Sequence, residues 1–116
     1  MHYNVVLMSP GYLGEFEQLV LLSVLRLEEA AYGATIRRAI EERAGRRIAI
    51  GSIYTTLDRL EGKGLLRSHM GEPTAERGGR RRKLYALTKA GRAALASVYE
   101  TWNAMTEGLA RKLEAL

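Results

Sequence analysis

The chain has 116 residues, no cysteine and a net charge of +5, which suits one folded domain with a single hydrophobic core. The absence of cysteine excludes disulfides, Cys-ligated zinc and thiol catalysis, and it agrees with a cytoplasmic location. The longest apolar stretch covers residues 19–25 and contains a serine, so it is far shorter than the ~20 residues of a membrane span, and we expect no membrane association.

The chain is predicted to begin with an arm and then a helix. Residues 1–12 have neither the cationic start nor the long apolar core of a signal peptide, and we interpret them as an N-terminal arm. Residues 13–27, LGEFEQLVLLSVLRL, repeat apolar side chains at helical spacing after two early glutamates, which predicts a helix. A second apolar face of Leu21, Leu22 and Leu25 indicates burial on more than one side, in the core or against another subunit.

Two further helices follow closely. The segment 34–45 has helical apolar spacing and ends at Gly45, a residue type that commonly stops helices. The segment 51–64, GSIYTTLDRLEGKG, carries one apolar stripe and ends in two glycines, which predicts a third helix. The stripe consists of Ile53, Leu57 and Leu60.

The next elements are a hairpin and a final helix. Residues 65–72 and 82–88 show partial alternation of apolar and polar side chains and are joined by a loop rich in turn formers and cations, which predicts two β-strands. Thr88 lies where a helix N-cap belongs, because its hydroxyl can accept a hydrogen bond from an early amide. A single helix is predicted from Lys89 towards Leu116.

This order of elements predicts a mostly α-helical fold with a small β-hairpin. We interpret residues 13–87 as a winged helix-turn-helix domain and residues 88–116 as a C-terminal dimerisation helix. In such a domain the helix after the turn lies in the major groove of DNA. The third helix has a polar face opposite its apolar stripe, and hydroxyls with a cation suit contacts to phosphates and base edges. The face consists of Ser52, Thr55, Thr56, Arg59 and Lys63. A merely solvated helix face is the alternative interpretation.

A cationic run at the hairpin supports the interpretation as a DNA-binding domain. It follows two glycines, so it can reach a flanking phosphate or the minor groove, and it consists of Arg80, Arg81, Arg82 and Lys83. Residues 33–92 carry fifteen cations and six anions, whereas residues 1–32 carry one and four and residues 93–116 carry two and three. This concentration of positive charge is typical of a polyanion footprint, with a solvated surface as the alternative.

The last predicted helix has apolar residues at heptad spacing, as in a coiled coil. We call the set Leu95, Val98, Trp102, Met105 and Leu109 the seam. Lys112 interrupts the pattern. Packing on a partner helix is favoured over a stripe buried within the domain, so the seam predicts a homodimer.

Catalysis has little support in the sequence. The two histidines, His2 and His69, are far apart, and no carboxylate pair stands at metal-ligand spacing from either. The GGRRRK segment does not follow the phosphate-loop pattern. We therefore expect no catalytic residues, no metal site, no cofactor and no enzymatic activity.

Four segments together resemble the PadR family of bacterial and archaeal transcriptional regulators, over about residues 13–110. They are LGEFEQLVLLSVLRL, AYGATIRRAIEER, GSIYTTLDRLEGKGLL and GGRRRKLYALTKAG. The resemblance implies a homodimeric winged-helix repressor of the subgroup with one short C-terminal helix. It assigns Ser52, Tyr54, Thr55 and Arg59 to the recognition helix and the residues from Arg80 to Lys83 to the wing. Tyr54 lies off the polar face, so its contact with DNA rests on the resemblance alone, and packing is its other interpretation.

The predicted function is that of a sequence-specific regulator, a repressor, which binds double-stranded DNA as a homodimer at a pseudo-palindromic operator. Trp102, the only tryptophan, is favoured as an interface anchor, while family resemblance also suggests an aromatic on which a flat small-molecule inducer stacks. Two other functions remain open, namely a winged-helix module that binds proteins and a non-specific binder of nucleic acid.

Overall fold

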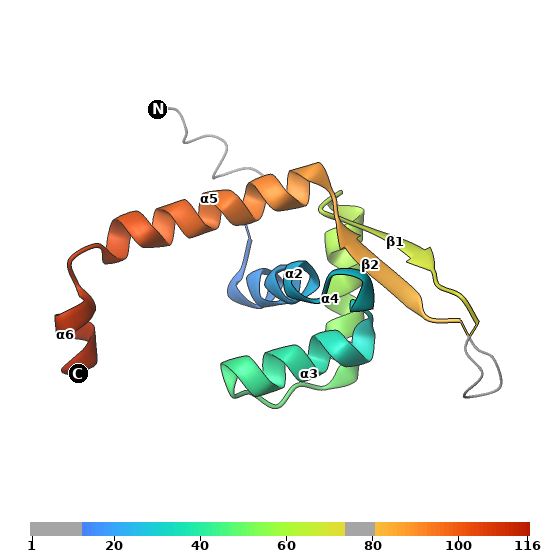
Figure 1. The fold of residues 1–116 in the computed structure, drawn as a ribbon, viewed down its shortest axis with the longest axis horizontal. Coiled ribbons are helices and arrows are strands. Elements are labelled where there is room, and N and C mark those ends of the chain that lie inside the picture. Colours follow the sequence, from blue (N-terminus) through green and yellow to red (C-terminus); the bar gives the residue numbers. More distant parts are fainter. Residues whose placement is uncertain (1–12, 74–80) are drawn as a thin grey trace.

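The computed structural model describes residues 13–73 and 81–116. The N-terminal arm and Arg80 of the predicted wing lie outside these residues. The elements follow the predicted order and are drawn in Figure 1. They are α2 (Glu15–Leu27), the 3₁₀ turn η1 (Glu28–Ala30), α3 (Gly33–Ala44), α4 (Ile50–Gly62), β1 (Leu66–Met70), β2 (Lys83–Leu87), α5 (Lys89–Thr106) and α6 (Ala110–Glu114).

Glycines end the second and third helices, as the sequence predicts. Gly45 caps α3 with φ of 67°, a left-handed conformation that glycine adopts without strain. Gly64 has φ of 79° after α4. Its amide donates to Glu61 O, and the amide of Leu65 donates to Leu60 O, both at 3.0 Å. These two bonds form a Schellman motif, which turns the chain directly into the hairpin.

The two strands confirm the predicted hairpin. They pair antiparallel, with Leu66 opposite Leu87 and Met70 opposite Lys83. The edge of β2 that does not pair with β1 is bonded to the helical part of the domain, because the Tyr85 amide donates to Ala31 O at 2.9 Å. The hairpin therefore projects from the helical layer from a fixed base (Figure 1).

The junction between hairpin and last helix is tightly bonded. Thr88 Oγ1 accepts from the Gly91 amide at 3.0 Å and donates to Gly64 O at 2.7 Å, which confirms Thr88 as the N-cap of α5. Gly91 has no room for a side chain, because an added Cβ would lie 3.1 Å from the carbonyl carbon of Leu65 and closer still to its oxygen. The start of α5 is thus fixed against the end of α4.

The core surrounds α2, which contacts α3, α4, β2 and α5 and lies between α3 and α5 in Figure 1. The fully buried side chains of the core come from three helices and the hairpin. The largest are Leu21, Ile36, Ile53, Leu57, Leu60, Leu66 and Val20. The observed fold confirms the predicted winged helix-turn-helix class.

The prediction of one continuous helix from Lys89 towards Leu116 is wrong. The helix α5 ends at Thr106, and Gly108 follows with φ of 80°. That conformation breaks the helical hydrogen-bond pattern, and glycine adopts it at no steric cost. Leu109 is the N-cap of the separate short helix α6. The heptad spacing therefore continues on one helix only as far as Met105.

Candidate nucleic-acid interface

The helix α4 presents one buried and one exposed face. Ile53, Leu57 and Leu60 of the predicted apolar stripe are completely buried, at 0% exposure. Ser52, Thr55 and Arg59 are exposed. Because the stripe locks the helix in its rotation, the exposed side chains are held at defined positions on the surface.

The predicted polar face is wrong at Thr56, which is only 4% exposed. At 3.6 residues per turn Thr56 falls beside the apolar stripe, so the exposed face is centred on Thr55 rather than on Ser52. This face also includes Asp58, an anion that sequence reasoning left out, and the glycines at 51 and 62. No side chain or backbone atom lies within 4 Å of a Cβ added at either glycine.

Lys63, predicted on the same face, forms an ion pair within the protein. Its Nζ lies 2.9 Å from Glu17 Oε2 and 3.2 Å from Glu17 Oε1. Arg59 Nη1 lies 4.0 Å from the same carboxylate. The side chain of Glu17 is 10% exposed, that of Lys63 26% and that of Arg59 52%. Of the two cations, Arg59 is therefore the more accessible.

The carboxylate of Glu17 is held in its charged form. Burial raises its pKa, but hydrogen bonds from Lys63 and the Gly14 amide, together with the positive charges of Lys63 and Arg59, outweigh this effect and leave the pKa below its ordinary value. The Gly14 amide donates to Oε1 at 3.1 Å. Glu17 thus accepts a hydrogen bond from an unpaired amide at the start of α2 and neutralises the charge of Lys63 at the end of α4.

Tyr54 has a packing role that the sequence left open. A Cβ added at Gly33 would lie 2.6 Å from Cζ of Tyr54, so the ring covers the start of α3 and would have to shift if residue 33 carried a side chain. Tyr54 is still 47% exposed. It therefore joins α3 to α4 and also borders the exposed face of α4.

The described wing cations differ in their surroundings. The Arg82 guanidinium carbon lies 4.5 Å from the centroid of the Tyr32 ring, a cation–π contact. Lys83 Nζ lies 4.0 Å from Glu61 Oε1 and 5.8 Å from the Tyr85 ring centroid. Arg81 is exposed. The base of the wing is thus fixed to the start of α3, while Arg81 and Lys83 are exposed among the described wing cations.

The strands also bury a tyrosine beneath the wing. Tyr85 is 3% exposed, and its burial, with the nearby negative charges of Asp58 and Glu61, raises its pKa to about 12. The phenol therefore stays neutral at physiological pH. Ser68 Oγ donates to Glu61 Oε2 at 2.7 Å, so Glu61 links β1 to α4.

The seam divides between two environments. Leu95 is 6% exposed and belongs to the core, and Val98 packs against that core. Trp102 and Met105 are 59% and 68% exposed, and α5 extends beyond the other helices at its C-terminal end (Figure 1). The predicted partner surface is thus exposed at Trp102 and Met105, whereas Leu95 forms the intradomain stripe that the sequence left as an alternative.

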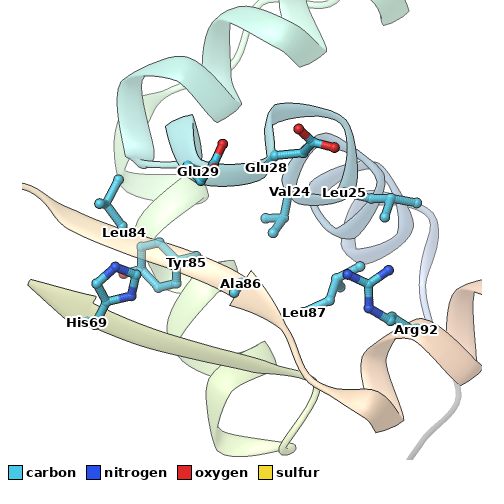
Figure 2. A pocket seen from close by; sticks show the side chains of 10 residues that line it. All are labelled: Val24, Leu25, Glu28, Glu29, His69, Leu84, Tyr85, Ala86, Leu87 and Arg92. Carbon is cyan, nitrogen blue, oxygen red and sulfur yellow. The ribbon is translucent and has the colours of Figure 1, made fainter. Parts of the chain in front are cut away.

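A groove of about 520 Å³ lies between the end of α2, β2 and the start of α5. Figure 2 shows carboxylates of Glu28 and Glu29 on one side of it and Arg92 near one end. The remaining lining residues are Val24, Leu25, His69, Leu84, Tyr85, Ala86 and Leu87. Trp102 lies outside this groove, so the two features do not form one site.

The described residues contain neither a membrane-spanning helix nor a cluster of metal ligands. Within residues 13–73 and 81–116, no helix is both long and apolar enough to cross a membrane. The same residues hold no group of three or more His, Cys, Asp or Glu side chains placed to bind a metal ion.

Sequence reasoning missed three of these residues. Glu17 was visible as a first-turn anion, but its partner Lys63 lies 46 positions away, and no local pattern signals such a pairing. Tyr32 meets Arg82 across a similar separation, and Asp58 falls between the polar positions that the spacing selected. Long-range packing brings Glu17 and Tyr32 to the interface, whereas Asp58 lies on α4 itself.

Similarity to known proteins agrees with this architecture. A family model described as "Transcriptional regulator PadR-like family" matches residues 21–97. A PadR family transcription regulator from Clostridium difficile R20291 is 26% identical with a TM-score of 0.67, covering 84% of this chain and 98% of its own. A PadR-like transcription factor from Bacteroides fragilis is 27% identical with a TM-score of 0.69, covering 92% and 96%.

A third similar structure is a PadR family transcriptional regulator from Eggerthella lenta. It is 30% identical with a TM-score of 0.62, and the match covers 88% of each chain. No curated protein matches this chain. The similarity thus extends over most of both chains in all three structures.

Proposed function

Because the chain belongs to the PadR-like family of transcriptional regulators, we propose that it is a sequence-specific DNA-binding regulator that acts as a homodimeric repressor on a pseudo-palindromic operator. The family consists of transcriptional regulators and not of enzymes. Its place of action is proposed to be the cytoplasm, where bacterial and archaeal chromosomes lie.

The main support is the exposed polar face of α4 above a completely buried apolar stripe. Ser52 and Thr55 offer short hydroxyls. Arg59 offers a guanidinium that can form two parallel hydrogen bonds to a guanine edge or a phosphate. The wing is joined to this face through α3, because Arg82 lies over Tyr32 and Tyr54 covers Gly33. A recognition helix and a wing fixed to the same support can bind one stretch of duplex together.

The homodimer is supported by the exposed apolar surface of the helices. Trp102 and Met105 on α5, with Leu22 and Leu25 on α2, are between 43% and 68% exposed. Large apolar side chains exposed on the surface favour association. A two-fold dimer would present two α4 helices to half-sites about one helical turn, roughly 34 Å, apart.

The exposed side chain of Trp102 is also where a small-molecule inducer would bind. Trp102 exposes 59% of its surface in the single chain, which suits either a partner helix or a flat apolar ligand. We favour the partner helix, because the neighbouring Met105 is also exposed, at 68%, and the two side chains form an apolar strip rather than an enclosed pocket.

Selection of bound sequences from random duplex DNA, at a stated salt concentration, tests the function. The expected result is one enriched sequence with two symmetric half-sites. Arg59→Ala should change the enriched sequence and cost about 1 to 3 kcal/mol if Arg59 reads a base. Arg81→Ala should weaken binding to all duplexes and flatten the salt dependence by about one unit. Arg111→Ala, which removes an exposed cation of α6, is the control and should change neither.

The other outcomes identify the alternatives. Binding that random competitor DNA abolishes would indicate a non-specific nucleic-acid binder. A folded protein without affinity for any duplex at low salt would indicate a protein-interaction module. A single unsymmetrical site would contradict the dimer, and equal losses of Arg59→Ala on specific and random DNA would reassign Arg59 to phosphate.

A further inference from the structure

Glu17 occupies an unusual position for a charged residue. It is the only carboxylate that is buried within residues 13–73 and 81–116, and it stands at the start of α2, outside the recognition helix. Its two oxygens receive the Lys63 ammonium at 2.9 and 3.2 Å, and Arg59 lies 4.0 Å away. Glu17 therefore contacts both cations of the exposed side of α4, which the function proposed above does not explain.

We propose that Glu17 is a specificity-determining positioning residue, which keeps Lys63 as an internal ion pair and holds Arg59 in the orientation in which it meets DNA. This inference rests on the proposed DNA binding. Glu17 itself does not touch DNA. It acts through the two cations that flank it on α4.

Burial protects the contact between Glu17 and Lys63 from water. Glu17 is 10% exposed and Lys63 26%, so their contact is largely shielded from solvent and salt. A DNA phosphate would have to replace a carboxylate that is fixed on its other side by the Gly14 amide. Lys63 is thus already neutralised, and its binding to a DNA phosphate would take the closest charged partner away from the buried Glu17 carboxylate.

The same carboxylate also lies near Arg59. The side chain of Arg59 is 52% exposed, yet its Nη1 remains within 4.0 Å of the carboxylate. The pairing with Lys63 keeps Glu17 in place, so its carboxylate attracts the guanidinium of Arg59, while about half of the Arg59 side chain stays accessible to a ligand. A long arginine side chain restrained in this way loses less conformational freedom when it binds a base edge. Restraint of Arg59 should therefore increase sequence preference more than total affinity.

Glu17→Gln tests the proposal, with binding to operator and random duplex measured by fluorescence anisotropy from 50 to 200 mM salt. The amide keeps the shape of the side chain and removes its charge, so Lys63 becomes available to phosphate. We expect the salt slope on random duplex to steepen by about 0.9, which is an additional loss of about threefold across this range. Binding to random duplex at 50 mM should tighten, and the ratio of operator to random affinity should fall.

Two further variants test the role of Lys63, one of them without changing Glu17. Lys63→Gln should leave the salt slope unchanged, because the lysine that it removes is internally neutralised. In the double variant Glu17→Gln, Lys63→Gln the slope should return to the wild-type value. Glu100→Gln changes the net charge equally at an exposed position of α5 and is the matched control. Far-UV circular dichroism establishes that each variant is folded.

The outcomes separate this inference from the proposed function. Wild-type protein that binds no duplex would overturn both. Wild-type protein that binds its operator, with a Glu17→Gln slope equal to that of Glu100→Gln, would overturn only the role of Glu17 and leave it a purely structural ion pair. A Lys63→Gln variant with a slope one unit flatter would show that Lys63 contacts phosphate, and would overturn the inference in the same way.

Discussion

The two ends of α5 have the same heptad spacing of apolar residues but different surroundings. At the first end, Leu95 is 6% exposed and belongs to the core of the winged domain. At the other end, Trp102 and Met105 are 59% and 68% exposed beyond the edge of the domain. The helix is regular over the whole of residues 89–106, so the difference comes from what the helix meets and not from its own conformation.

This difference shows how one helix can serve two purposes. The start of α5 is bonded through Thr88 to Gly64, just after α4, and the helix contacts α2, with Leu95 in the core. The later turns extend from this fixed base, so their direction is set by the domain. A partner bound at Trp102 would therefore be placed relative to α4, which is what a dimer needs in order to match the spacing of two half-sites.

Leu95→Ala should have the largest effect. The substitution leaves a cavity in the core, and Leu→Ala changes at buried sites cost about 2 to 5 kcal/mol of unfolding free energy. Urea unfolding at one fixed protein concentration measures this, since association also contributes to the stability of a dimer. Leu116→Ala removes the same atoms from a side chain that is 99% exposed and should change stability by less than about 0.5 kcal/mol. Equal effects of the two would break the comparison.

Trp102→Ala should affect association more than folding. Large aromatic residues at interface centres contribute about 2 kcal/mol or more, so the dimer dissociation constant should rise roughly 30-fold, as sedimentation velocity would detect. Trp102→Phe keeps an aromatic ring and should retain most of the association. A dimer that Trp102→Ala leaves intact would contradict the anchor and favour the ligand interpretation of this side chain.

Thr88→Ala should have a moderate effect at the fixed end of α5. The change removes the hydroxyl that accepts from the Gly91 amide and donates to Gly64 O. Loss of a helix N-cap costs about 1 kcal/mol, visible as a lower urea midpoint. Thr88→Ser keeps the hydroxyl and should stay close to wild type. If both variants unfold at the same midpoint, the junction does not depend on these bonds.

Gly108→Ala should have the smallest effect, at the end of α5 away from the core. Alanine is strained by about 1 kcal/mol at the φ of 80° found here, so the variant should favour a continuous helix through residue 108 and show more negative ellipticity at 222 nm. Gly62→Ala is the control, because Gly62 lies in α4 with open space around it. This variant should increase the free energy of unfolding by about 0.5 to 1 kcal/mol. Unchanged ellipticity in Gly108→Ala would show that contacts other than the glycine hold α6 apart.

Local patterns predicted much of the fold because the forces behind them are local. The cap at Thr88, the stop at Gly45 and the apolar stripe of α4 depend on neighbouring residues and on helical periodicity. The break at Gly108 was missed, since a glycine within an apolar heptad pattern can be tolerated or can end the helix. The pattern alone does not decide between these outcomes.

The candidate site was less predictable. The spacing selected Ser52, Thr55 and Arg59, which the structure exposes, but also Thr56, which it buries. The rotation of α4 is decided by how α2 and α3 pack on it, and a small rotation transfers a residue at the border of the polar face into the core. Arg82 and Lys63 were likewise selected as free cations, although Tyr32 and Glu17 contact them.

The sequence by itself thus determined the winged helix-turn-helix class, the order of its elements and the region where positive charge concentrates, because periodicity, capping and composition are properties of short segments. Only the tertiary structure decided which cations face solvent, where the exposed face of α4 is centred, and that Leu95 and Trp102 have different surroundings. Those outcomes depend on contacts between residues tens of positions apart, and their pairing is fixed only when the helices pack together.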